Sequence, residues 1–145
     1  MRRFLTLASL ALALAVPGAV AQQASAPHEW LFGAWTGGAF PPADNSNPRC
    51  LGQPTVLFTR DVVMRATPLD FAYRQRLIET VAARENGVEF RLTPVPVPGG
   101  RVPADFAFGC QGGPDVLLVE RRAADEIVLP NCEEMPFPLR RCGAP

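Results

Sequence analysis

Proline interrupts this chain so often that long helices are excluded. Sixteen of its 145 residues are proline, and all but Pro17 lie beyond residue 21. A proline inside a helix removes a backbone hydrogen bond and clashes with the turn before it, so it kinks or ends the helix. Between the prolines, several stretches alternate polar and apolar residues, which is the pattern of a strand with one buried face. The sequence therefore predicts a mostly β domain.

The start of the chain has the pattern of a cleavable export signal. Two arginines give a positive start, residues 4–16 are almost continuously apolar, and small residues at 19–21 provide a cleavage site. The 13 residues of the apolar run are fewer than the roughly 20 that span a bilayer. We expect a signal peptide at residues 1–21 and a soluble mature domain at residues 22–145, in the periplasm or secreted, without stable membrane insertion.

The length and charge of the mature part indicate its number of domains and the kinds of partner it can attract. Removing 21 of the 145 residues leaves 124, a one-domain length that buries roughly 65 % of the unfolded chain's surface. The whole chain has 14 basic and 14 acidic residues, and the signal contains two of the basic ones, so the mature net charge is near −2. Such a charge does not attract nucleic acid or anionic lipid.

The four cysteines, all in the mature part, predict two disulfides, because even numbers of cysteines in exported chains usually pair. No two of them have the close spacing that structural zinc sites favour, so we expect no metal. Three pairings are possible. We favour Cys110 with Cys132, which would close the ends of a hairpin, and Cys50 with Cys142, which would pin the C-terminal tail to the body.

The clearest local structure is a hairpin within residues 71–94. Asn86 and Gly87 lie between two alternating runs and favour the positive φ angles of a tight two-residue turn. A turn centred there places Arg84 opposite Glu89, a charge pair suited to the solvated face.

Further strands make a closed sheet the expected fold. Seven or eight antiparallel strands in so short a chain must hide their edges, and an up-and-down β-barrel does so, with a β-sandwich as the alternative. The further strands are expected at residues 35–40, 56–65, 102–108, 115–120, 126–129 and 137–141.

Gly33 and Trp35 carry the one resemblance to a known family. Their glycine-any-tryptophan spacing resembles the signature that opens the first strand of lipocalin-like barrels and of small periplasmic protease inhibitors of similar shape. The match covers these two residues. The resemblance implies that Trp35 plugs one end of a barrel.

Catalytic patterns are lacking, so we expect no enzyme and no cofactor. His28 is the only histidine, and a zinc-protease helix would need a second one where Phe32 stands. No serine lies in a nucleophile elbow, no glycine-rich loop has phosphate-binding spacing, and the cysteines are expected to be oxidised. We interpret His28 as a surface residue without a special role.

One strand offers a candidate ligand site. If residues 71–83 alternate without interruption, Tyr73, Gln75 and Glu79 face inward and line a pocket together with Trp35. A buried carboxylate is costly unless it is paired, so it would mark a cavity. The favoured alternative is a bulge near Leu77-Ile78 that turns Glu79 out to solvent and Ile78 in.

Three functions are compatible with these features. The leading one is a non-enzymatic, lipocalin-like binding protein for a small apolar or amphipathic ligand or for an envelope partner. The second is a periplasmic protease inhibitor that plugs a protease with residues 22–29, and the third is a structural or assembly protein without a pocket. The arginine pairs Arg121-Arg122 and Arg140-Arg141 are expected to be solvated, but together they would suit an anionic partner if they converge in space.

Overall fold

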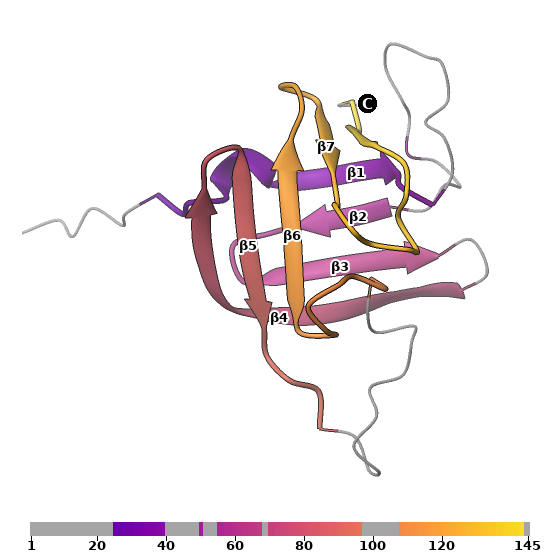
Figure 1. The fold of residues 1–145 in the computed structure, drawn as a ribbon. Helices are drawn as coiled ribbons and strands as arrows, with labels where there is room; N and C mark the ends of the chain where they lie inside the picture. The colour runs from indigo at the N-terminus through magenta and orange to yellow at the C-terminus, as the bar shows by residue number, and fades with distance from the viewer. Residues whose placement is uncertain (1–24, 40–49, 51–54, 68–69, 97–107, 144–145) are drawn as a thin grey trace, which may run out of the picture.

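The chain folds into a closed antiparallel barrel of eight strands. The computed structural model describes residues 25–39, 50, 55–67, 70–96 and 108–143. Each strand pairs with its neighbours in sequence, and β8 pairs with β1 to close the barrel (Figure 1). The predicted all-β barrel is therefore confirmed, and the sandwich alternative is wrong. The predicted signal at residues 1–21 lies outside the described residues.

The elements are short, except for one long strand. A 3-10 helix, η1 (Glu29–Leu31), precedes the barrel. The strands are β1 (Gly33–Gly37), β2 (Thr55–Phe58), β3 (Val62–Thr67), β4 (Asp70–Arg84), β5 (Gly87–Leu92), β6 (Val116–Arg121), β7 (Glu126–Val128) and β8 (Leu139–Arg141). Figure 1 shows β5 and β6 steeply inclined to β1, β2 and β3, as expected for opposite walls of a barrel with tilted strands.

The up-and-down order gives the barrel two different ends. η1 and the turns at residues 59–61, 85–86 and 122–125 lie at one end, here called the tryptophan end. The connections that follow β1, β3, β5 and β7 leave from the other, here called the loop end. A ligand can reach inward-facing side chains only at these ends, because the wall between them encloses the core.

The interior between the two ends is packed with apolar side chains. Trp35, Phe58 and Phe90 are fully buried, and the rings of Phe58 and Phe90 stack with centroids 5.7 Å apart. Burying one such side chain contributes about 1.5 to 3 kcal/mol. The other large side chains that are fully buried among the described residues are Leu31, Val56, Val63, Val88, Leu92, Leu117, Val119, Ile127 and Leu139.

The predicted strand at residues 56–65 is in fact two strands. The polar residues 59–61 form a turn, in which the backbone N–H of Thr59 donates to the carbonyl of Val62 at 2.9 Å. The Thr59 hydroxyl accepts from the N–H of Val62 at 3.0 Å. Because the chain reverses here, the alternation of residues 56–58 does not continue through the turn, and Val63 faces the interior. Of the strand predicted at 102–108, only the last residue is described, and it is in no strand.

The predicted hairpin forms, but its turn lies one residue earlier. Arg84 pairs with Gly87, so the two turn residues are Glu85 and Asn86. Neither Asn86 nor Gly87 has a positive φ. Gly87 is needed for a different reason: a side chain there would overlap the carbonyl of Val119 on β6. Gly87 is therefore required by the close approach of the β5 and β6 backbones. Rules for turn sequences do not describe such a contact.

Replacing Gly87 by valine should lower the free energy of unfolding by about 1 to 3 kcal/mol, because β5 and β6 would have to move apart. The matched control is Ala83→Val, an exposed position in the same hairpin, which should change stability by less than about 0.5 kcal/mol. Urea midpoints measure both. Equal midpoints would show that β5 and β6 do not approach this closely.

Two disulfides tie the connections to the barrel. They join Cys50 to Cys142 and Cys110 to Cys132, the pairing favoured from sequence. Two disulfides are typical of proteins in an oxidising, exported environment. Within the described ranges, no helix has the length and apolar character needed to cross a membrane.

Candidate functional site

β4 presents the opposite face to the interior from the one needed for the predicted pocket. Arg76 pairs with the buried Val63, so the even-numbered residues up to Ile78 face inward. The register then shifts between Ile78 and Thr80, and beyond the shift Val81 packs against the core. Gln75 and Glu79 are exposed, and Ile78 packs against the core. The structure therefore has the outward-facing Glu79 of the bulge alternative. Of Tyr73, the structure describes only its place in β4.

The orientation of β4 goes against simple hydropathy. Leu77 is 59 % exposed, whereas Arg76 is only 2 % exposed. The Arg76 guanidinium donates to the carbonyls of Pro114 at 2.9 Å and Thr93 at 3.2 Å, and it forms an ion pair with Asp115. These partners offset the desolvation of the charge, which would otherwise be prohibitive in an apolar interior.

Arg76 is one of three arginines on the inner face at the loop end. Arg65 on β3 pairs directly across from Arg74 on β4, two positions before Arg76, so all three share the face. We call Arg65, Arg74 and Arg76 the arginine mouth. Like charges placed directly opposite on neighbouring strands repel. The arrangement therefore favours negative groups at this end of the barrel.

The carboxylates of Glu134 and Asp115 form ion pairs with arginines of this group. Glu134 forms an ion pair with Arg65, whose guanidinium also lies 5.6 Å from the centroid of the Phe108 ring. The carboxylates are about one-third exposed, 34 % for Asp115 and 32 % for Glu134, so they lie at the rim while the guanidinium groups lie deeper. The Cys110–Cys132 disulfide joins the two segments that carry them.

Trp35 lies at the tryptophan end of the barrel, against η1. The buried Trp35 indole donates from Nε1 to the carbonyl of Leu31 in η1 at 2.8 Å. Arg141 lies with its guanidinium 4.2 Å from the Trp35 ring centroid and donates to the carbonyls of Phe32, at 2.8 Å, and Trp30. Burial, and secondly the charge of Arg121, lowers the pKa of Arg141.

His28 has a structural place, so its interpretation as a surface residue was wrong. It is 2 % exposed, and its Nε2 lies 3.0 Å from the carbonyl of Thr59 and 3.1 Å from that of Arg60. Phe32 and Phe90 contact the ring edge-to-face, each with centroids 5.1 Å apart. Sequence reasoning missed this because the partners lie 31 and 32 residues away.

His28 also bears on the predicted inhibitory plug. Residues 22–29 are described from residue 25 on, and the N–H of Glu29 donates to the carbonyl of Ala26 at 2.9 Å. With His28 buried, the second half of that segment is part of the barrel end and does not extend away from it.

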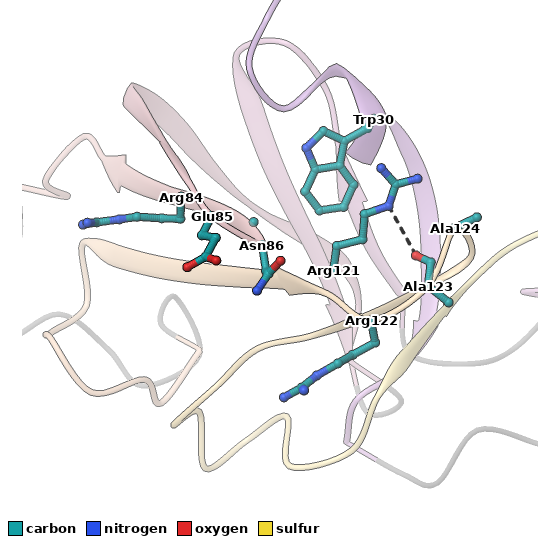
Figure 2. Close-up of a pocket in the computed structure, with 9 residues that line it drawn as sticks. Trp30, Arg84, Glu85, Asn86, Arg121, Arg122, Ala123 and Ala124 are labelled. Carbon is teal, nitrogen blue, oxygen red and sulfur yellow. Dashed lines mark hydrogen bonds between the residues drawn. The ribbon is translucent and has the colours of Figure 1, made fainter.

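A surface hollow of about 450 Å³ lies at the tryptophan end, outside the barrel (Figure 2). It is bordered by Trp30, by the turn between β4 and β5, and by the turn between β6 and β7. Three arginines line it, Arg84, Arg121 and Arg122, together with Glu85. Among the described residues, no group of three or more histidine, cysteine or acidic side chains is placed to hold a metal ion.

Comparison with known proteins does not assign the chain to a family. No protein-family model matches it, and no significant match was found among curated proteins or solved structures.

Proposed function

We propose that this protein is an exported, non-enzymatic barrel that binds a small amphipathic anion at the arginine mouth. One observation carries the proposal: Arg65 and Arg74 face each other on the inner wall of a barrel whose interior is otherwise mainly apolar. The anionic group of the ligand would bind these arginines, and its apolar body would lie against the barrel wall.

The chemistry of arginine supports an anionic group. The planar guanidinium forms two parallel hydrogen bonds to a carboxylate or phosphate, and such charge-assisted pairs are stronger than neutral hydrogen bonds. An anion beside Arg65 and Arg74 would be attracted by both guanidinium groups. The effect is larger inside a barrel than in water, because the effective dielectric constant is lower there.

The surroundings of the mouth are buried apolar side chains, so an apolar ligand body would have to enter between them. Val56 on β2 pairs directly across from Arg65, and Val63 pairs across from Arg76. Phe108 contributes an aromatic face beside Arg65. Apolar walls with a few placed polar groups are the usual composition of small-molecule sites.

The proposal predicts that decanoate binds more tightly than decanol, which has the same chain without the charge. Arg74→Gln should weaken decanoate binding about tenfold, since a hydrogen bond to a charged group contributes about 1.5 to 3 kcal/mol. The control is Arg91→Gln on β5, an arginine that is 63 % exposed. Isothermal titration measures the affinity of the wild type, Arg74→Gln and Arg91→Gln for both compounds. Equal affinity for decanol, no binding of either compound, or an equal loss in Arg91→Gln would contradict the proposal.

A second variant should change the affinity for decanoate in the opposite direction. Glu134 is the carboxylate that an incoming anion would displace from Arg65. Glu134→Gln should therefore raise the affinity for decanoate while it lowers the stability of the unliganded protein, because the ion pair is lost. Unchanged or weaker binding would mean that the Arg65–Glu134 pair is purely structural.

A further inference from the structure

The two arginine pairs of the sequence are divided in the same way by the fold. In each pair, one arginine lies beside a strand carboxylate: Arg122 is 3.3 Å from Glu120, and Arg140 is 3.3 Å from Glu126. The other arginine of each pair lies against a tryptophan ring, at 5.1 Å for Arg121 with Trp30 and 4.2 Å for Arg141 with Trp35. Both of these contacts are at the tryptophan end, so the pairs converge in space.

Arg121 and Arg141 differ in how many hydrogen-bond donors of the guanidinium are already used. The guanidinium of Arg141 donates to two backbone carbonyls and has a structural role. Arg121 is exposed, and among the described residues its side chain forms one hydrogen bond, from Nε to the carbonyl of Ala123 at 3.4 Å (Figure 2). In the part of the chain that the structure describes, no carboxylate forms an ion pair with Arg121. Both of its terminal nitrogens are therefore available to a ligand.

The Trp30 ring holds Arg121 in a defined position. A guanidinium over an indole face is attracted by the ring quadrupole and loses less freedom when it then binds an anion. Figure 2 shows Asn86 between Glu85 and Arg121, on the wall of the same hollow. The charge of Arg121 also acts against the neighbouring Arg141, which lowers the pKa of Arg141 after the effect of burial. An anion beside Arg121 would relieve this repulsion.

We propose that the hollow between Trp30 and the two hairpin turns is an oxyanion site, with Arg121 as its principal ligand-binding residue. The group that fits is a carboxylate or a phosphate on a small molecule, since the planar fork of arginine matches both. The hollow, at about 450 Å³, is within the size range of small-molecule sites. It lies at the opposite end of the barrel from the arginine mouth and does not depend on the function proposed there.

The probes are inorganic phosphate and citrate, titrated at constant ionic strength into the exported protein while its tryptophan fluorescence and the heat of binding are followed. We expect saturable binding of at least one probe with a Kd of about 1 mM or lower. The tighter of the two probes identifies the preferred group. Absence of saturable binding for both would overturn the proposal.

Variants separate a specific site from a general effect of charge. Arg121→Gln should weaken binding of the preferred probe about tenfold. Arg121→Lys keeps the charge but not the fork, and should weaken it several-fold. Arg91→Gln, which removes an exposed charge elsewhere, should change it less than twofold. An equal loss in Arg91→Gln and Arg121→Gln would overturn the proposal. Decanoate binding should be unchanged in Arg121→Gln, so this site and the arginine mouth can fail separately.

Discussion

Removing the Cys50–Cys142 disulfide by the double substitution Cys50→Ser and Cys142→Ser is expected to lower the free energy of unfolding by about 4 to 5 kcal/mol. The bridge joins residues 92 positions apart, so its loss frees most of the described barrel in the unfolded chain. A cross-link stabilises a fold mainly by restricting the unfolded ensemble, and the restriction grows with the length of the closed loop.

The position of the bridge adds a second reason. Cys142 directly follows β8, a strand of three residues that closes the barrel against β1. Its backbone N–H donates to the carbonyl of Ala34 at 2.9 Å. A strand this short has few ladder hydrogen bonds of its own, so the disulfide keeps it in place.

The matched control is the double substitution Cys110→Ser and Cys132→Ser. That bridge closes a loop of 22 residues, for which the same relation predicts about 3 kcal/mol. Urea unfolding of both double variants under identical conditions gives the comparison. A smaller loss for the Cys50 and Cys142 variant than for the control would show that loop length does not govern the effect of these bridges.

Local sequence patterns were sufficient for the features that depend on neighbouring residues. The β4–β5 and β6–β7 hairpins, the disulfide count and the barrel class follow from alternation, turn residues, the number of cysteines and the need to hide strand edges. Trp35, which a spacing of two residues singled out, is buried in the barrel. In each of these cases the interacting groups are close in sequence, or their number alone restricts the outcome.

The features that sequence reasoning missed depend on distant partners. Arg76 faces the barrel interior because Pro114 and Asp115, 38 and 39 residues away, supply its acceptors. Periodicity treats Leu77 as the buried residue and Arg76 as the exposed one, so it places β4 the wrong way round. The arginine mouth depends on the pairing of Arg65 on β3 with Arg74 on β4, which the sequence does not specify.

The inward orientation of Arg76 can be tested with a substitution for which structure and hydropathy predict opposite changes in stability. Arg76→Met places an apolar side chain of similar length in the interior, and on hydropathy alone it should stabilise the protein. We expect it to lower the free energy of unfolding by about 1 to 3 kcal/mol instead, because it leaves three polar groups at the rim without their donor. These groups are the carbonyls of Thr93 and Pro114 and the carboxylate of Asp115.

Two further variants assign this loss to its cause. Arg91→Met removes an exposed arginine from β5 and should change stability by less than about 0.5 kcal/mol. Combining Arg76→Met with Asp115→Leu should recover part of the loss, since replacing both partners of an ion pair by apolar groups is often close to neutral. The recovery should stay incomplete, because the carbonyls of Thr93 and Pro114 still lack their donor. Thermal and urea unfolding measure the three variants, and a more stable Arg76→Met protein would show that β4 does not turn this face to the interior.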